Sequence, residues 1–172
     1  NLYTQTFTLT INPVNDAPVA TDLSASVAED GAVDITLSST DLDNDNLTFT
    51  LSSQPTNGTT NLNGAIVNYA PNPDYNGQDI FTFQASDGTE SSQVKTVTVT
   101  VTAVNDSPAA SDLSATTNED VSVQVTLTAQ DVENDDLTYT ILEPPVNGTA
   151  ALADSVLTYQ PNINFSGTDA TT

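Results

Sequence analysis

The fold class predicted by the sequence is all-β, with tandem antiparallel β-sandwiches of about 90 residues each. Three observations support this prediction. The sequence repeats itself at a fixed offset, short segments alternate apolar with polar residues, and turn-forming pairs of Asn or Asp with Gly separate those segments. No window of about 11 residues carries an apolar stripe with the helical period, so no helix is expected.

The internal repeat sets the expected domain organisation. Val14-Asn15-Asp16-Ala17-Pro18 returns as Val104-Asn105-Asp106-Ser107-Pro108, an offset of 90 positions (104 minus 14). Residues 41–45 return at the same offset with similar chemistry. We therefore expect the last strand of a preceding repeat in residues 1–14, a complete repeat in residues 15–104, and a second repeat without its final strands in residues 105–172. Such a chain is expected to be a piece of a longer array.

Seven short strands are expected within the complete repeat. The first, near residues 20–27, runs from the Asn15-Asp16 linker to the pair Glu29-Asp30. The second, third and sixth strands contain alternating apolar and polar residues, which is the period of a half-buried strand. These three segments are residues 33–37, 47–51 and 80–83.

Turn residues and alternation place the remaining strands. Asn57-Gly58 and Asn63-Gly64 supply turns on either side of a short fourth strand, because Asn and Gly tolerate positive φ. The fifth strand is expected near residues 66–69, and the last strand at residues 96–102, where Thr alternates with Val. Seven strands in about 90 residues indicate an antiparallel sandwich of the immunoglobulin-like type.

Running these strands alternately up and down gathers the acidic residues at the two ends of the repeat. One end lies beside the junction with the preceding repeat, and the other faces the junction with the next repeat. The candidate metal ligands at the first junction are Asn15, Asp16, Asp41, Asp43, Asp45 and Asp87. Those at the second junction are Glu29, Asp30, Asn105, Asp106, Asp131, Glu133 and Asp135.

Composition limits the chemistry that these residues can perform. The chain has 23 acidic residues against one basic residue, Lys95, and its formal net charge is -22. With so little positive charge it is not expected to bind nucleic acid or anionic membranes, and no segment is apolar enough for membrane insertion. The absence of Cys and His excludes thiolate zinc sites, disulfides and His-assisted nucleophiles. Hard oxygen ligands remain, and these suit Ca²⁺.

Electrostatic repulsion favours a bound cation at such clusters. Two carboxylates about 4 Å apart repel each other by roughly 4 kcal/mol at an effective dielectric constant near 20. A divalent ion among them removes that repulsion, and Ca²⁺ accepts six to eight oxygens in flexible geometry. The competing interpretation is that the acids are solvated turn residues that keep the protein soluble. The acidic residues gather at one end of the repeat and recur at the second junction, and both features favour a bound ion over solvated turn residues.

The spacing Asp41-x-Asp43-x-Asp45 also begins like an EF-hand loop, and the sequence excludes that motif. An EF-hand needs Gly at its sixth position and Glu at its twelfth, where this chain has Asn46 and Ser52. The flanking segments are also predicted strands rather than helices.

Together these motifs resemble the cadherin repeat, and specifically the bacterial cadherin-like tandem repeats of large surface adhesins. The resemblance covers nearly the whole chain, and the combination of four spaced motifs is fairly specific. The residues that carry it are Val104-Asn105-Asp106-Ser107-Pro108, Asp41-Leu42-Asp43-Asn44-Asp45, Phe83-Gln84-Ala85-Ser86-Asp87-Gly88 and Glu29-Asp30.

The resemblance implies cadherin-like sandwiches joined into a rod outside the cell and stiffened by Ca²⁺. Carried over by position, it implies the ligands Asn15, Asp16, Asp41, Asp43 and Asp87 at the first junction, and Glu29, Asn105, Asp106, Asp131 and Glu133 at the second. The acidic residue expected just before each linker is replaced by Pro13 and Ala103. Fewer ions per junction than in the animal family are therefore expected.

The leading hypothesis is non-enzymatic: calcium-stiffened spacer repeats of a secreted, extracellular bacterial adhesin or matrix protein, with a structural role in cell adhesion and biofilm. The expected partners are neighbouring repeats of the same chain. Paired carboxylates can hydrolyse glycosides, but here the acids recur with the repeat, which favours a structural role.

Two alternatives stay open. A carbohydrate-binding module needs an exposed aromatic platform, and the chain has no Trp and one loop aromatic in the complete repeat, Tyr75. Polysaccharide stays a possible partner because Tyr75 could serve as that platform. The second alternative is self-assembly by homophilic strand exchange, in which residues 7–11 add to the second repeat of a neighbouring copy. Because the second repeat also lacks its sixth strand, we expect an imperfect fit.

Overall fold

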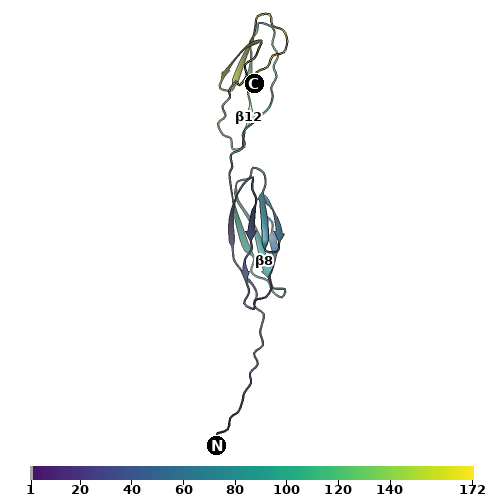
Figure 1. The fold of residues 1–172 in the computed structure, drawn as a ribbon, viewed down its shortest axis with the longest axis vertical. Coiled ribbons are helices and arrows are strands. Elements are labelled where there is room, and N and C mark those ends of the chain that lie inside the picture. Colours follow the sequence, from purple (N-terminus) through teal and green to yellow (C-terminus); the bar gives the residue numbers. More distant parts are fainter. Residues whose placement is uncertain (1) are drawn as a thin grey trace. The chain divides into compact units, whose positions relative to one another are not determined.

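The computed structural model describes residues 2–172, and these residues form strands and turns without a helix. The chain divides into two compact units between Val104 and Asn105 (Figure 1). The all-β prediction is confirmed. None of the described residues belongs to a helix that is long and apolar enough to cross a membrane.

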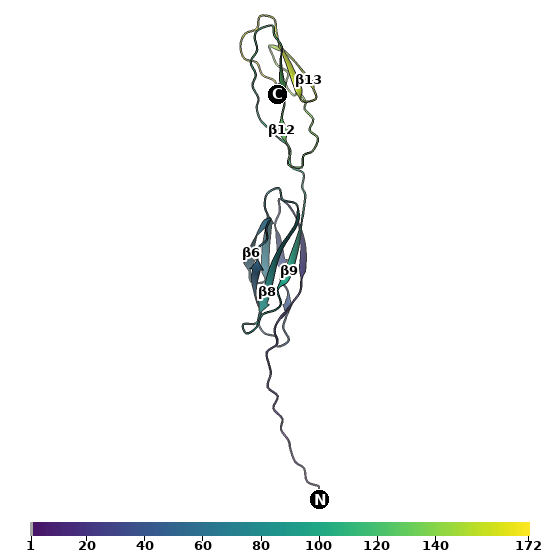
Figure 2. The same cartoon turned by 180° about the vertical axis from the view of Figure 1, so that it is seen from behind.

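The first unit is a two-layer sandwich. One layer has the strand order β2-β9-β8-β5 and the other β3-β7-β6, while β1 pairs with β4 at the rim. Figure 2 shows β8 and β9 side by side. The strands are β1 (Val19–Ala20), β2 (Leu23–Ala28), β3 (Val33–Thr36), β4 (Ser39–Thr40), β5 (Thr48–Ser53), β6 (Gly58–Asn63), β7 (Ile66–Pro71), β8 (Gly77–Ser86) and β9 (Lys95–Thr102).

The single first strand predicted near residues 20–27 is instead two strands in different sheets. β1 pairs antiparallel with β4, and β2 pairs parallel with β9, from Leu23 opposite Val97 to Ala28 opposite Thr102. The chain changes sheet at residues 21–22, where the Asp22 carboxylate accepts a hydrogen bond from the Thr96 amide at 2.8 Å. That hydrogen bond fixes the start of β2 beside β9.

Alternating residues of β7, β8 and β9 form the core between the two layers. The fully buried side chains of largest volume are Tyr69, Phe81, Phe83, Val67, Val97 and Val99. Each buried apolar side chain of this size contributes about 1.5–3 kcal/mol relative to an exposed one. The period-2 pattern of the sequence therefore corresponds to the buried face of each strand.

Residues 2–14 belong to the first unit but form no strand. Their apolar side chains are exposed, including Phe7, Leu9 and Ile11. The interpretation of this segment as the last strand of a preceding repeat stays a prediction, because its partner strands would lie in another repeat.

A buried carboxylate connects three parts of the first unit. Asp79 at the start of β8 is 3% exposed, and it accepts hydrogen bonds from the Thr56 and Asn57 amides at 3.1 and 2.9 Å. The Tyr69 hydroxyl donates to the same carboxylate at 3.0 Å. Burial raises the pKa of this hydroxyl, and the bond to Asp79 raises it further. The loop before β6 is thereby fixed to β7 and β8.

Gly58 is required by a close approach rather than by its backbone conformation. A Cβ atom at this position would lie 2.6 Å from the Tyr69 ring and 2.7 Å from the Ala70 carbonyl oxygen. Gly148 contacts the Tyr159 ring in the same way in the second unit. The sequence interpretation of Asn57-Gly58 as a positive-φ turn is wrong for Gly58, whereas Gly64 has a φ of 60°.

The second unit repeats one layer of the first. Its sheet has the order β11-β14-β13, which corresponds to β3-β7-β6, and β10 pairs with β12 as β1 does with β4. Asp169 accepts hydrogen bonds from the Val146 and Asn147 amides and from the Tyr159 hydroxyl, as Asp79 does in the first unit. The strands are β10 (Ala109–Ala110), β11 (Val123–Thr126), β12 (Ala129–Gln130), β13 (Gly148–Ala153) and β14 (Val156–Pro161).

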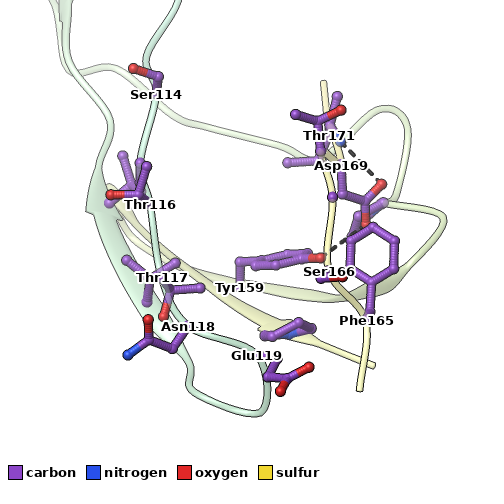
Figure 3. A pocket seen from close by; sticks show the side chains of 18 of the residues that line it. Ser114, Thr116, Thr117, Asn118, Glu119, Tyr159, Phe165, Ser166, Asp169 and Thr171 are labelled. Carbon is purple, nitrogen blue, oxygen red and sulfur yellow. Dashed lines mark hydrogen bonds between the residues drawn. The ribbon is translucent and has the colours of Figure 1, made fainter. Parts of the chain in front are cut away.

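A groove of about 570 Å³ lies on the second unit beside this sheet. Figure 3 shows Ser114, Thr116 and Thr117 on one side, Asp169 and Thr171 on the other, and the Tyr159 ring between them. The residues that correspond to β2 form no strand here, and Leu113 is 50% exposed.

We predict that Asp79→Asn destabilises the first unit by about 2 kcal/mol, because the charged acceptor of several buried hydrogen bonds is lost. Chemical denaturation followed by tyrosine fluorescence measures this change. Asp74→Asn is the matched control, since Asp74 is exposed and its φ of 59° also suits Asn. Equal stability of the two variants would contradict the structural role of Asp79.

Candidate metal site at the start of the first sandwich

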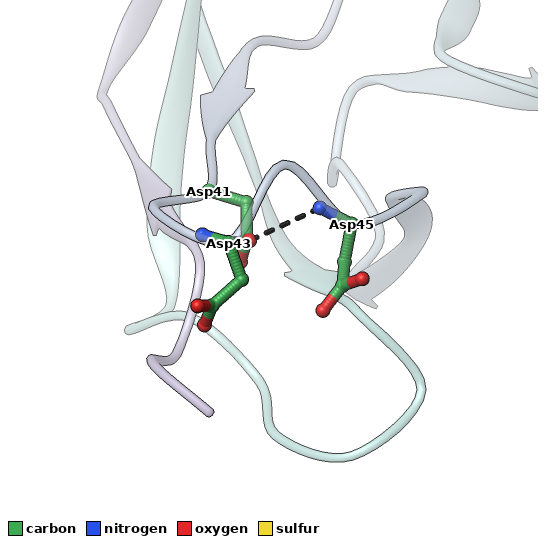
Figure 4. A group of neighbouring side chains, drawn as sticks. All are labelled: Asp41, Asp43 and Asp45. Carbon is green, nitrogen blue, oxygen red and sulfur yellow. Dashed lines mark hydrogen bonds between the residues drawn. The ribbon is translucent and has the colours of Figure 1, made fainter. Parts of the chain in front are cut away.

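The loop at residues 41–45 is folded by its own first residue. Asp41 follows β4, and its Oδ1 accepts hydrogen bonds from the amides of Asp43 and Asp45 at 2.9 and 3.2 Å (Figure 4). Asn44 adopts a φ of 62°, which Asn tolerates better than most residues. The Asp-x-Asp-Asn-Asp pattern therefore produces a tight turn around the Asp41 carboxylate.

This turn brings three carboxylates together. One oxygen from each of Asp41, Asp43 and Asp45 lies within 4.8 Å of the others, the one such group in the part of the chain that the structure describes. Figure 4 shows the Asp43 and Asp45 carboxylates on the same side of the turn. Asp41 is half-buried and the other two are exposed. The mutual repulsion of these groups favours a cation beside them.

One oxygen of this group has no partner. The Asp41 Oδ2 atom is buried and has no hydrogen-bond partner among the described residues. A buried carboxylate oxygen without a donor is costly, because the desolvation of the charge is not compensated. A Ca²⁺ ion would supply that compensation, and carboxylate oxygens are the ligands it prefers. The residues present therefore fit a calcium ion.

The loop also holds the segment that leads into the sandwich. The Asp16 amide donates to Asp43 Oδ2 at 2.8 Å, and the Asn15 side-chain amide donates to Asp87 Oδ2 at 3.0 Å. The structure thus brings Asn15 to Asp87, and Asp16 to the group of three carboxylates. An ion at this loop would act directly on the point where the chain enters the repeat.

The Asp87 carboxylate is held by several donors. The Glu90 amide lowers its pKa most, followed by the Asn15 side chain and the Thr89 amide. Because the folded-state pKa is depressed, the stability that Asp87 contributes is present above its unfolded-state pKa. It is lost as pH falls through the folded-state value.

Glu29, at the opposite end of the first unit, is a buried residue. It is 2% exposed, and its Oε1 accepts a hydrogen bond from the Val104 amide at 2.5 Å. Its Oε2 is buried without a hydrogen-bond partner in the described residues. Asp30 is exposed in the turn after β2. Glu29 therefore fixes the segment that leaves the sandwich, and its second oxygen fits a cation.

The second unit reproduces the connection between linker and loop. The Asp106 amide donates to Glu133 Oε2 at 3.3 Å, which corresponds to the bond from Asp16 to Asp43 at an offset of 90. The Asp135 amide donates to Asp131 Oδ1 at 3.0 Å, as in the first loop. The Asn105 side chain donates to the Asp106 carbonyl. Metal binding by these residues stays a prediction.

Sequence reasoning missed the role of Asp79 and Asp169, although the offset of 90 relates them together with Tyr69 and Tyr159. A carboxylate that recurs with a tyrosine ten residues before it was the available signal.

The possible sugar platform, Tyr75, donates its hydroxyl to the Gln78 carbonyl at 2.6 Å and packs against the core. Its ring is therefore not a free platform, and polysaccharide binding stays a prediction.

Comparison with known proteins supports the fold. A family model described as bacterial Ig domain matches residues 15–102 and 105–172. The human protocadherin-24 EC1-2 structure is 17% identical, with a TM-score of 0.52, over 87% of this chain and 80% of that chain. This likeness shows the fold, and it agrees with the predicted resemblance to cadherin-like repeats.

Other similar structures are parts of larger proteins. An endo-fucoidan hydrolase of glycoside hydrolase family 107 is 23% identical, with a TM-score of 0.44, over 90% of this chain and 26% of that chain. SGBP-B from the Bacteroides ovatus mixed-linkage glucan utilization locus, solved in complex with a mixed-linkage heptasaccharide, is 14% identical, with a TM-score of 0.37, over 88% of this chain and 42% of that chain. The chain thus spans about a quarter of that hydrolase. No curated protein matches the sequence.

We predict that Asn15→Ala raises the pKa of Asp87 toward its ordinary value, because one of the donors that stabilise the charged carboxylate is removed. The bonds from Thr89 and Glu90 remain, so the rise is partial. Carbon-detected NMR titration of the side chain measures it. Asn46→Ala, at an exposed position in the loop after Asp45, is the control. An unchanged Asp87 titration in Asn15→Ala would contradict the assigned hydrogen bond.

Proposed function

The chain belongs to the bacterial Ig domain family, as two tandem copies, and from this premise we propose that it is a calcium-binding, non-enzymatic spacer of an extracellular adhesin or matrix protein. The observation that carries the proposal is the group of Asp41, Asp43 and Asp45, with a buried Asp41 oxygen that lacks a donor.

Calcium fits this group better than other common ions. The available atoms are carboxylate and carbonyl oxygens on a loop, without any His or Cys in the chain. Ca²⁺ accepts irregular sets of such oxygens, whereas Mg²⁺ requires near-ideal octahedral geometry. Extracellular modules bind Ca²⁺ at about 10⁻⁴ to 10⁻³ M, which suits a site with exposed ligands. The absence of Cys is compatible with this location.

The proposed role of the ion is mechanical. Asp43 and Asp87 hold the lead-in residues Asp16 and Asn15, and Glu29 holds Val104 at the exit. A cation at the Asp41–Asp45 loop restricts the direction in which the chain enters the sandwich, and a separate cation at Glu29 restricts the direction in which it leaves. Spacer repeats that are restricted in this way separate an adhesive tip from the cell surface. Recurrence of the acids with the repeat supports this structural role over catalysis.

We predict that calorimetric titration of the whole chain detects Ca²⁺ binding with a dissociation constant of about 10⁻⁴ to 10⁻³ M. Asp41→Asn should weaken it about tenfold or more, since a charged ligand is lost while Asn keeps an oxygen for the turn. Asp34→Asn, an exposed carboxylate on β3, is the control and should bind like the wild type. Equal affinity of Asp41→Asn and the wild type would remove the basis of the proposed site.

We also predict that chelation changes the arrangement of the two units more than their folding. Small-angle scattering should show a broader distribution of distances in EDTA than in millimolar Ca²⁺, whereas circular dichroism should change little. Ca²⁺ at a hundredfold excess over its dissociation constant adds about 2.7 kcal/mol to the bound state. Identical scattering curves in both conditions would contradict the stiffening role.

A further inference from the structure

The β3-β7-β6 sheet of the first unit has an edge without charge. Residues 46–73, which contain β5, β6 and β7, include no Asp, Glu, Lys or Arg, although the formal net charge of the chain is -22. Among the described residues, β6 pairs on one side only, with β7 (Figure 2). Two copies of such an acidic chain repel each other, and the repulsion is least where the approaching surfaces carry no charge.

The other edge strands of the two layers are protected against pairing, whereas β6 is not. β5 has a register shift between Leu51 and Ser53, and β3 carries the exposed carboxylate of Asp34. β2 lies directly between the acidic residues Asp22 and Glu29. Bulges, charges and Pro are the features that keep an edge strand from pairing with another chain. β6 contains none of them.

The backbone of β6 alternates between bonding to β7 and pointing to the free edge. The Asn72 amide donates to the Asn57 carbonyl at 2.8 Å, so Asn57 bonds toward β7. Gly58 lies opposite Pro71, which has no N–H to donate back. The residues whose N–H and C=O groups point to the free edge are therefore Gly58, Thr60 and Leu62.

The second unit has the same edge. β13 is the edge strand that corresponds to β6, and residues 144–153 around it carry no charge. The Asn162 amide donates to the Asn147 carbonyl at 2.9 Å, as Asn72 does to Asn57 in the first unit. An edge that recurs with the repeat lets two chains join at more than one point, which strengthens the contact.

We propose that the β6 edge of one copy pairs antiparallel with the β6 edge of a second copy, so that the two sheets become one. The register centred on Thr60 pairs every outward-pointing residue, with Thr60 opposite Thr60 and Gly58 opposite Leu62. Each pair exchanges N–H···O bonds in both directions, and these backbone bonds provide the affinity. Because the same strand lies on both sides, the contact is isologous and has a two-fold axis.

The side chains beside this edge suit a second copy of the chain. In this register, the exposed Thr59 lies opposite the exposed Asn61 of the second copy, so neutral hydroxyl and amide groups meet. Within each copy Asn61 pairs with Asn68, whose side-chain amide donates to Asp34 at 2.7 Å. The row of polar groups therefore continues across the contact. A cationic partner would be attracted to the acidic loops instead, and an acidic partner would be repelled by the net charge.

The proposal goes beyond the calcium-binding function and does not depend on it. No carboxylate takes part in the pairing, so association is expected in EDTA as well as in Ca²⁺. Salt screens the repulsion between the two acidic copies. Association should therefore strengthen as ionic strength rises, whereas a contact held by ion pairs would weaken.

The first test is the dependence of mass on protein and salt concentration. Analytical ultracentrifugation of the whole chain in EDTA should show a mean mass that rises about twofold or more from micromolar to millimolar protein. The rise should begin at lower protein concentration in high salt. A chain that stays monomeric at millimolar concentration in high salt would overturn the proposal.

Proline substitutions locate the contact. Thr60→Pro combined with Ala150→Pro should keep the chain monomeric, because each Pro removes an N–H at the free edge and leaves the bonds to β7 and β14 in place. Thr36→Pro combined with Thr126→Pro is the matched control at the opposite edges of the same sheets, and it should still assemble. Circular dichroism checks the folding of both variants. Equal association of the two variants would contradict the assigned edge.

The control positions follow from the same alternation. The Leu37 amide donates to the Ala65 carbonyl at 2.8 Å, so the preceding residue, Thr36, points away from β7. The Leu127 amide donates to the Ser155 carbonyl at 2.7 Å in the second unit, which places Thr126 in the same way.

A second test reads the register without altering the backbone, because the chain contains no Cys. Thr59→Cys protein mixed with Asn61→Cys protein should form a mixed disulfide, since opposite residues of this kind bring their side chains closest. Thr59→Cys mixed with Asn63→Cys is the control, displaced by two residues. Mass spectrometry of the oxidised mixtures should show several times more mixed disulfide in the first mixture. Equal yields in the two mixtures, or no mixed disulfide in either, would refute the proposed pairing.

Discussion

This structure depends on one constraint: each of the two sheets must cover the apolar face of the other. In the first unit, β7 contributes Val67 and Tyr69 to the core, and β8 and β9 cover them from the other layer. Short strands cannot supply this burial alone, and so the alternating residues of both layers must face each other. In the second unit, the corresponding sheet β11-β14-β13 contains Tyr159, whose side chain is partly buried.

The same constraint positions the polar chemistry. Strands that are fixed in register deliver their turns to defined places, and the acidic loop after β4 lies where the chain enters the sandwich. Asp41 then organises its own loop through two backbone amides, without help from distant residues. Asp79 works differently, since it uses charge inside the core to hold a loop to two strands. Asp41 therefore determines the conformation of a surface loop, whereas Asp79 stabilises the interior of the sandwich.

Much of this was predictable because it follows from local pattern. The alternation in residues 96–102 determined both the strand and its buried face, and the repeated linker marked the boundary between units. The divided first strand was not predictable, because the change of sheet at residues 21–22 depends on a distant bond between Asp22 and Thr96. Gly58 was misinterpreted for the same reason: the ring that excludes a side chain there belongs to Tyr69, on another strand. In the candidate site, the spacing of the acidic residues predicted the group of Asp41, Asp43 and Asp45. It did not predict that one oxygen each of Asp41 and Glu29 is buried without a hydrogen-bond partner among the described residues.

The parallel pairing of β2 with β9 determines how the first unit responds to force. β2 follows the two-residue β1 near the start of the unit, β9 is the last strand of the unit, and six residue pairs join the two from Leu23 to Ala28. A pull on the two ends of the unit drives the strands past each other along their length, so this set of backbone bonds bears the load together. Rupture in shear needs far more force than peeling the bonds apart one by one. A tether made of such units would resist extension through its backbone geometry, whether or not an ion is bound.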